Sequence, residues 1–362
     1  MIYALSFLIS FTTCYFIIKF QYLHQHISGD FEFSGPQKIH KEIIPRIGGL
    51  AIMMGIYLSY AANKLFKLQD LDIPQIIVLC ALPTFSIGLL EDISKKVSIR
   101  IRLIFTIISA LLIIFLYCGT IQRINIPVIN ELLAIQFLSV LFTVFAIVGL
   151  TNSYNIIDGL NGLASMVGML SLSAILYISV RESDPQITGM TSLIIFSIFG
   201  FIVWNYPKGL LFLGDSGSYL IGFLVSILSI ALTTRNTNVS PWFALLLNGY
   251  PIVETIFSIY RRRILRGISP GSPDGLHFHT LIFKRVVRKY NADIIEDVSI
   301  RNAKSTPYLW ALTSICIIPT ILFYQSDIIM ISFLLIFIIL YIWLYRRMVL
   351  FKVPKWIFFF RQ

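Results

Sequence analysis

Charged residues are scarce in this chain, and their scarcity excludes a soluble protein of ordinary composition. Only 13% of the 362 residues are Asp, Glu, Lys or Arg, whereas 57% are hydrophobic; soluble domains carry about 25% charged residues. No polar stretch long enough for a separate domain of about 50 residues interrupts the apolar segments. Internal repeats typical of inverted-repeat transporters are also missing. We therefore expect one membrane domain over residues 1–362.

Cysteines are few, and their spacing argues against a covalent or metal framework. Cys14, Cys80, Cys118 and Cys316 stand singly in apolar segments, so neither a disulfide nor a zinc site is implied. The first residues lack the positive region and small-residue cleavage site of a signal peptide. Segment 1–20 is therefore expected to remain as a first span.

Long apolar segments recur along almost the whole sequence. About 20 such residues cross the roughly 30 Å of hydrocarbon as a helix. The sequence predicts an all-α, polytopic transmembrane helix bundle of about eleven spans. These are 1–20, 47–65, 74–91, 99–119, 133–150, 161–180, 189–205, 217–233, 241–259, 306–324 and 327–345.

The distribution of basic residues predicts the orientation, because Lys and Arg near span ends favour the cytoplasmic side. With the N-terminus outside, most of the 29 Lys and Arg residues fall in the inner segments, among them 21–46, 91–102, 260–305 and the basic tail 346–362. The C-terminus is then cytoplasmic. Anionic lipid headgroups and phosphate substrates explain the net charge of +11 more simply than nucleic acid does.

The first polar island, Glu91-Asp92, stands at the inner end of a predicted span. Adjacent carboxylates are costly there unless they meet water, a cation or a metal. Their mutual repulsion favours protonation of one of them, which suits a general base. The alternative is an ordinary helix end whose charge Lys95 and Lys96 balance.

The second island contains a regular series of polar residues. Asn152, Asn155, Asp158 and Asn161 recur every third residue and would line one face of a helix. Such a wall could hold hydroxyls, amides or a hard cation. A polar loop, with Asn and Gly as turn and cap residues, is the alternative.

The third island, Gly-Asp-Ser-Gly-Ser at 214–218, directly precedes a span. Its glycines permit close backbone approach, and amides at the following helix N-terminus favour anions. Asp215 can hold a magnesium ion that bridges phosphates. Alternatively, Asp215 or Ser216 only caps the helix.

Two basic segments complete the set. Lys38, His40 and Arg46 precede the second span, and an inner loop carries His277 and His279. Basic side chains suit phosphate recognition, and a His pair could orient a diphosphate or bind a metal. Arginines at 261–263 are expected at a cytoplasmic span end whatever the function.

Glu254 is a carboxylate set among apolar residues of the ninth predicted span. A buried acidic group needs a partner. We expect that partner to be a basic residue of the following loop.

Taken together, five ordered motifs resemble the polyprenyl-phosphate N-acetylhexosamine-1-phosphate transferase family, also called glycosyltransferase 4. They are Pro-Arg-Ile-Gly-Gly-Leu at 45–50, Glu-Asp at 91–92, Asn-Ile-Ile-Asp-Gly-Leu-Asn-Gly-Leu at 155–163, Gly-Asp-Ser-Gly-Ser at 214–218, and Pro-Asp at 273–274 with His-Phe-His at 277–279. The resemblance covers about residues 34–290, and the Asn and Asp motif is its most specific part.

This resemblance implies a bundle of ten or eleven helices with a Mg²⁺- or Mn²⁺-dependent site open to the cytoplasm. Asp215 matches the metal-binding aspartate. Asp92, with Glu91, would deprotonate or position the acceptor phosphate, and Asp158 belongs to the nucleotide-site motif. The expected substrate-binding residues are Lys38, His40, Arg46, Asn152, Asn155, Asn161, His277 and His279.

Four residues depart from the usual family pattern: Ser34, Glu91, Asn161 and Thr280. They favour the branch that begins O-antigen, capsule or wall-polymer chains over the muramoyl-pentapeptide phosphotransferase branch, which remains an alternative. The identity of the sugar stays open.

The implied reaction moves N-acetylhexosamine-1-phosphate, or a 6-deoxy derivative, from a UDP-sugar to undecaprenyl or another polyprenyl phosphate and releases UMP. The implied setting is the bacterial inner membrane, with membrane lipids as partners, and it allows a homodimer. A transporter or lipid flippase is the rival, because polar residues inside spans also mark ion paths. The clustering of these islands at one membrane face argues against it, since transporter sites lie near the midplane. A catalytically inactive scaffold is a third alternative.

Overall fold

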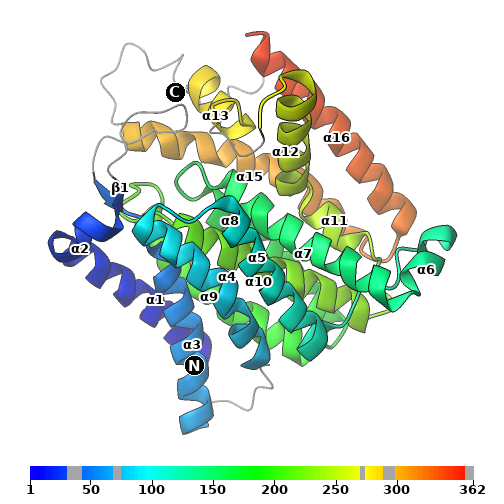
Figure 1. Ribbon diagram of the computed structural model, residues 1–362, viewed down its shortest axis with the longest axis horizontal. Coiled ribbons are helices and arrows are strands. Elements are labelled where there is room, and N and C mark those ends of the chain that lie inside the picture. Colours follow the sequence, from blue (N-terminus) through cyan, green and yellow to red (C-terminus); the bar gives the residue numbers. More distant parts are fainter. Residues whose placement is uncertain (31–42, 68–74, 270–273, 288–297, 355–362) are drawn as a thin grey trace.

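The computed structural model describes residues 1–30, 43–67, 75–269, 274–287 and 298–354 as an all-α, polytopic helical bundle (Figure 1). Within these ranges, nine helices are long and apolar enough to cross a membrane. They are α1 (Ile2–Lys19), α4 (Gln75–Ser94), α5 (Ile99–Ile113) continued by the π-helix η1 (Ile114–Cys118), α7 (Gln136–Ile157), α8 (Leu163–Arg181), α9 (Pro185–Asn205), α10 (Gly214–Arg235), α15 (Val298–Leu322) and α16 (Asp327–Val349). The predicted multi-pass fold class is confirmed.

Two of the eleven predicted spans do not appear among those nine helices. The segment 47–65 forms α3 (Gly48–Phe66), whose polar residues near its C-terminal end lower its hydropathy. The segment 241–259 is divided into α11 (Phe243–Leu247) and α12 (Gly249–Tyr260), followed by the π-turn η2 (Arg261–Leu265). The count of eleven is therefore not confirmed, although helices occur at all the predicted places.

Helix α10 forms the centre of the bundle (Figure 1), and every one of its residues from Gly214 to Leu232 is buried. It packs against α3, α4, α7 and α8. Small residues allow these backbones to approach closely: a Cβ on Gly222 would lie 2.9 Å from the Thr151 carbonyl oxygen of α7. The start of α10 is consequently enclosed by the ends of its neighbours.

The ion pairs among the described residues lie at the two ends of the bundle. At one end Arg235 pairs with Asp184 at 3.2 Å, and the Tyr324 hydroxyl donates to Glu182 at 2.9 Å. Arg123 donates to the Val239 carbonyl at 2.8 Å there. The polar islands predicted from sequence lie at the other end, where Asp92 in the last turn of α4 contacts the start of α10.

A short ribbon supports that second end. After α2 (Gln21–Ser28), strands β1 (Gly29–Asp30) and β2 (Ile44–Pro45) pair antiparallel. The Phe212 amide donates to the Pro45 carbonyl at 2.9 Å, and the Gly49 amide donates to Leu213 at 3.0 Å. These bonds fix the start of α3 beside the segment that leads into α10. The remaining short elements are α6 (Pro127–Leu133), α13 (Phe278–Ile282) and the π-turn η3 (Phe283–Val287).

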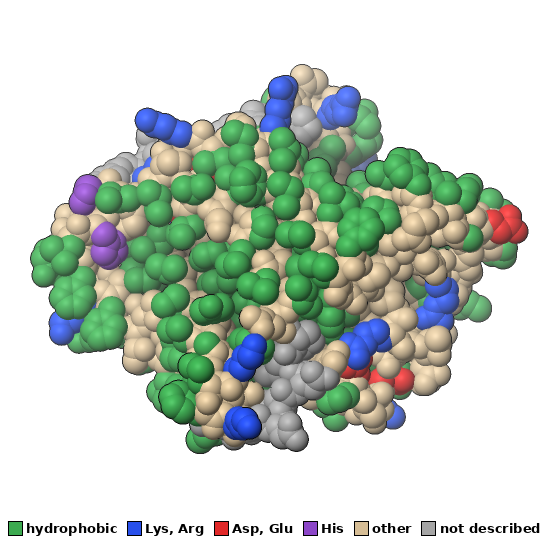
Figure 2. All heavy atoms as spheres, turned by 60° about the horizontal axis from the view of Figure 1, so that its bottom comes forward, with side chains coloured by type: hydrophobic (Ala, Val, Ile, Leu, Met, Phe, Trp, Pro, Cys, Tyr) green, Lys and Arg blue, Asp and Glu red, His purple; other side chains and the backbone are tan. Residues whose placement is uncertain are grey.

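The surface has the character expected of a membrane protein. Figure 2 shows hydrophobic side chains spread across the middle of one face, with Lys and Arg mainly toward its margins. Exposed apolar residues such as Phe145 and Ile339 can face lipid, because hydrocarbon rather than water surrounds them. The four cysteines are buried and unpaired.

Candidate active site

The first turn of α10 is held by Asp92 at the end of α4. The Asp92 carboxylate accepts hydrogen bonds from the backbone amides of Asp215 at 2.7 Å and Ser216 at 2.9 Å, and from the Ser216 hydroxyl at 2.6 Å. A helix N-terminus leaves such amides without intrahelical partners and favours negative charge. Asp92 thereby joins two helices that are distant in sequence.

Two glycines make this junction sterically possible. A Cβ on Gly88 would lie 2.7 Å from the Ser216 Cα atom. Gly214 has a φ of +74°, and a Cβ there would lie 2.0 Å from the Arg46 carbonyl oxygen. Only glycine combines this backbone conformation with so close an approach.

The Asp215 side chain is surrounded by donors from three other helices or their ends. Asn155 Nδ2 donates to Asp215 Oδ1 at 3.1 Å, and Arg46 Nη2 lies 3.6 Å from the same oxygen. Arg102, from the first turn of α5, forms an ion pair with Asp215 Oδ2. The structure thus brings together Arg46, Asn155 and Asp215, as the motifs predict.

Asp158 adds a further carboxylate to the site. It follows the last residue of α7, is half-buried, and its carboxylate makes no hydrogen bond with the described residues. Burial and the charge of Asp215 raise its pKa to about 7, and Arg46 offsets only part of this effect. Negative charge is therefore incompletely balanced around Asp158.

The Asp215 carboxylate offers oxygen atoms of the kind that a divalent cation binds. Mg²⁺ prefers oxygen ligands and usually keeps waters or phosphate oxygens alongside one or two carboxylates. Asp215 supplies such oxygens, and each of them faces a guanidinium group, Oδ1 that of Arg46 and Oδ2 that of Arg102. Among the described residues no three His, Cys, Asp or Glu side chains form a complete metal cage. A cation here would need oxygens from water or a phosphate.

The histidine motif meets the Asn and Asp motif at Gly159. His277 Nδ1 lies 2.9 Å from Glu254 Oε1, which confirms the expected loop partner for that buried carboxylate. A Cβ on Gly159 would lie 2.3 Å from His279 Nε2, so the His279 ring rests on the turn that carries Asp158. Burial lowers the pKa of His279 to about 3, which keeps the ring neutral.

A model of glycosyl transferase family 4 matches residues 74–233, the interval that holds Asp92, Asn155, Asp158 and Asp215. The chain is 30% identical over 258 residues to the undecaprenyl-phosphate alpha-N-acetylglucosaminyl 1-phosphate transferase of Escherichia coli K12, covering 68% of this chain and 67% of that protein. The chain belongs to glycosyl transferase family 4.

Two other relatives extend the comparison. A probable undecaprenyl-phosphate N-acetylglucosaminyl 1-phosphate transferase of Bacillus subtilis is 29% identical over 247 residues, covering 67% of this chain and 66% of that relative. An undecaprenyl-phosphate alpha-N-acetylglucosaminyl 1-phosphate transferase of Thermotoga maritima is 29% identical over 259 residues, covering 72% and 74%. The family resemblance seen in the motifs is thereby confirmed, and this family member is a multi-pass membrane transferase.

Three other residues that the sequence predicted for the site, Glu91, Asn152 and Asn161, form hydrogen bonds with backbone groups. Glu91 accepts a hydrogen bond from the Val97 amide at 2.8 Å. Asn152 donates to the Val148 carbonyl at 2.8 Å, and Asn161 donates to the Pro207 carbonyl at 3.2 Å. Because α7 ends at Ile157, the predicted helical stripe does not reach Asn161. Lys38 and His40 lie outside the described residues.

Ion pairs join Asp30, Arg46, Asp215 and Arg102. Of these four residues, the sequence did not indicate Arg102 and Asp30 as site residues. Arg102 pairs with Asp215, and Asp30 lies 3.8 Å from Arg46. Arg102 stands among four basic residues at a predicted inner span end, where the positive-inside rule already explains a basic side chain. Nothing in the neighbouring sequence distinguishes Arg102, as a site residue, from Arg100.

Proposed function

We propose that this family member transfers a sugar-1-phosphate from a UDP-sugar to polyprenyl phosphate and releases UMP. The main support is that Asp92 binds the start of α10 and that the cations of Arg46 and Arg102 lie beside the Asp215 carboxylate, while the charges of Asp215 and Arg46 both act on the pKa of Asp158. The names of the relatives support undecaprenyl phosphate as acceptor and N-acetylglucosamine as the sugar.

In the proposed reaction an oxygen of the lipid phosphate attacks the β-phosphorus of the UDP-sugar. A bond forms between that oxygen and the β-phosphorus, and the bond from the β-phosphorus to the bridging oxygen breaks. UMP leaves with the bridging oxygen, and the sugar keeps its phosphate in the new lipid diphosphate. Phosphoryl transfer of this kind depends mainly on alignment and neutralisation of charge.

We assign the metal-holding role to Asp215. A bound Mg²⁺ or Mn²⁺ would supply charge neutralisation between phosphates. Arg46 and Arg102 stand beside Asp215 at its two carboxylate oxygens. Their guanidinium groups can bind phosphate oxygens when the donor enters.

The carboxylates take different roles in this proposal. Asp158 has no side-chain partner among the described residues and a pKa raised to about 7, which suits proton acceptance from the lipid phosphate. Asp92 has three donors on its two oxygens, so it positions Asp215. Glu91 holds the turn after α4 through the Val97 amide.

We further propose that the site faces the cytoplasm of a bacterial inner membrane. The site lies at one end of the bundle, and most Lys and Arg residues belong to segments at that end. The same position argues against a transporter, whose binding groups would lie near the midplane of broken helices. His277 and His279 would complete the donor site from the loop side, with Asn152 and Asn161 supporting its walls.

The decisive experiment measures UMP release by the purified protein. Undecaprenyl phosphate is supplied with a panel of UDP-sugars, with and without Mg²⁺, and the lipid product is identified by mass spectrometry. We expect Mg²⁺-dependent UMP release with at least one N-acetylhexosamine donor, and its loss in Asp215→Asn. A folded protein that releases no UMP with any donor would refute the proposal and favour a transporter or an inactive scaffold.

A further inference from the structure

Glu254 is a fully enclosed carboxylate in α12 that joins three parts of the chain. It is 1% exposed. Its Oε1 atom accepts from His277 Nδ1 at 2.9 Å and from the Phe278 amide at 3.2 Å, and its Oε2 atom accepts from the Tyr341 hydroxyl of α16 at 2.6 Å. The histidine motif is therefore attached to two helices through one side chain.

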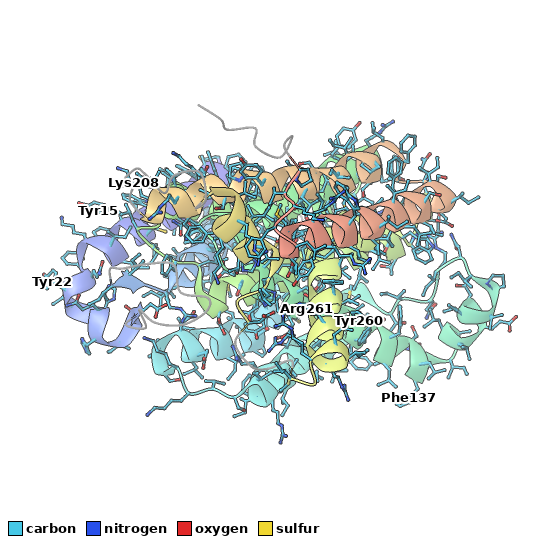
Figure 3. All side chains as sticks on the ribbon, turned by 90° about the horizontal axis from the view of Figure 1, so that it is seen from above. Tyr15, Tyr22, Phe137, Lys208, Tyr260 and Arg261 are labelled. Atoms are coloured by element: carbon cyan, nitrogen blue, oxygen red, sulfur yellow. The ribbon has the colours of Figure 1, made fainter. Side chains whose placement is uncertain are left out.

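His277, which Glu254 holds in place, packs directly against His279. The two imidazole rings are stacked with centroids 5.4 Å apart and an interplanar angle of 4°. His277 Nε2 also faces Asp274 Oδ2 at 3.6 Å, and Asp274 is paired with the buried Arg261. Figure 3 labels Arg261 together with its neighbour Tyr260, which is 45% exposed. His277 is thus fixed from both sides.

His279 in turn bears on the site itself. Its Nε2 atom rests where a side chain on Gly159 would be, and Gly159 directly follows Asp158. His279 is 3% exposed, and its Nδ1 atom has no hydrogen-bond partner in the described structure. A shift of this ring would move the turn that carries Asp158.

Packing alone does not account for a carboxylate at position 254. A buried ionised group is costly to desolvate, and an apolar residue of similar volume often serves stability equally well. A carboxylate bound to one nitrogen of an imidazole, by contrast, fixes the orientation of the ring and its tautomer. Glu254 binds Nδ1 of His277 in this way, so its contacts indicate that it orients the imidazole ring.

We propose that Glu254 is a positioning residue for the transfer reaction, acting through His277 to set the His279 ring against the Asp158 turn. Tyr341 supports it, which makes α16 part of the active-site framework although α16 lies outside the residues that the family model matches. The kinetic part of this inference rests on the proposed function; the placement of the histidines does not.

The first test is carbethoxylation of histidines by diethyl pyrocarbonate, with the modified residues mapped by mass spectrometry. The exposed His26 provides an internal reference for reagent and detergent. In the unaltered protein we expect His277 and His279 to react at least about tenfold more slowly than His26, because both are buried. Glu254→Gln should accelerate both, and Tyr341→Phe should do so more weakly.

The second test is a double-mutant cycle on kcat/KM for UMP release. We expect Glu254→Gln to lower kcat/KM roughly tenfold, the scale on which such outer partners act. In a His277→Ala background the same change should have less than about a twofold effect, because the two residues act as one unit. Glu254→Asp should restore part of the activity.

A matched control comes from the opposite end of the bundle. Glu182 accepts a hydrogen bond from the Tyr324 hydroxyl at 2.9 Å, as Glu254 does from Tyr341. Glu182→Gln should leave kcat/KM and the labelling of His277 unchanged. Thermal unfolding of each variant shows whether a loss of activity follows a loss of fold.

Unchanged histidine labelling in Glu254→Gln would overturn the positioning role, whether or not the protein releases UMP. Equal effects of Glu254→Gln in the two backgrounds would overturn the route through His277. If Glu254→Gln does not fold, Tyr341→Phe decides both tests, since it removes one hydroxyl only. If the unaltered protein releases no UMP, the proposed function fails while the labelling result still stands.

Discussion

The backbone amide of Asp215 donates a 2.7 Å hydrogen bond to the side chain of Asp92, across 123 positions of sequence. The acidic pair at the end of α4 and the proposed metal-holding residue at the start of α10 therefore form one unit. Both residues are buried, and Gly88 and Gly214 allow the helices to approach that closely. The geometry of Asp215 depends on Asp92 before any substrate binds.

Replacement of Asp92 should damage both stability and activity. In Asp92→Asn the new amide group would face the N–H donors of Asp215 and Ser216, leaving a buried donor unsatisfied, at a cost of about 1–3 kcal/mol. We expect a lower thermal midpoint in detergent and at least about a hundredfold loss of UMP release. Glu91→Gln is the matched control, because Glu91 is less buried and binds only the Val97 amide. Equal losses in both variants would contradict this division of roles.

Arg102 should compete with a metal ion for Asp215. Its guanidinium group pairs with Asp215 Oδ2, so removing this charge leaves the carboxylate freer to bind a cation. Arg102→Ala should tighten Mn²⁺ binding about fivefold, which corresponds to about 1 kcal/mol for a partly exposed ion pair. Electron paramagnetic resonance of free Mn²⁺ gives the affinity without requiring turnover. Arg100→Ala alters an exposed neighbouring arginine and should have no effect; weaker binding in Arg102→Ala would refute the competition.

Much of the architecture could be predicted because lipid imposes a simple rule on sequence. Apolar runs of about 20 residues become helices, since the backbone must satisfy its own hydrogen bonds in hydrocarbon. The division of the ninth predicted span into α11 and α12 was not predicted, because Gly249 and Pro251 begin a new helix within an apolar segment. Hydropathy does not register such a break.

The site was predictable where chemistry is local to a motif, and less so where it depends on distant partners. Arg46, Asn155 and Asp215 meet as their motifs indicate. Asn161 was expected beside them, but it lies beyond the end of α7. Its side-chain amide donates instead to the carbonyl of Pro207, 46 positions away in sequence. Arg102 was not predicted as a site residue, because an arginine at the cytoplasmic end of a span is expected whatever the function.

Gly159 should be intolerant of any side chain. A Cβ there would lie 2.3 Å from His279 Nε2, so Gly159→Ala must displace the ring or the Asp158 turn. We expect at least about a tenfold loss of kcat/KM for UMP release, on the scale of misplaced catalytic groups. Gly149→Ala serves as the control, because no atom lies within 4 Å of a Cβ at that position in α7. Gly149→Ala should keep full activity; normal activity in Gly159→Ala would contradict the assigned contact.

Asp158 should give the protein a pH dependence centred near neutrality. Burial, with the charge of Asp215, raises its pKa to about 7, so the folded state holds a proton that the unfolded chain, with an ordinary Asp pKa of about 3.9, has lost. Without a metal, stability should therefore fall as pH rises from about 4 through about 7. Mg²⁺ should restore stability above pH 7, because a cation compensates the ionised carboxylate.

The same titration should appear in the rate of UMP release. If ionised Asp158 accepts a proton, kcat/KM should rise with pH up to the pKa of Asp158 in the free protein, about 7, and then level off. Asp158→Asn removes this titrating group, so its residual rate should lose the rise toward pH 7, and its metal-free thermal midpoint should fall less steeply toward pH 7 than that of the unaltered protein. An equally steep fall in the thermal midpoint of Asp158→Asn would contradict the assignment of this titration to Asp158.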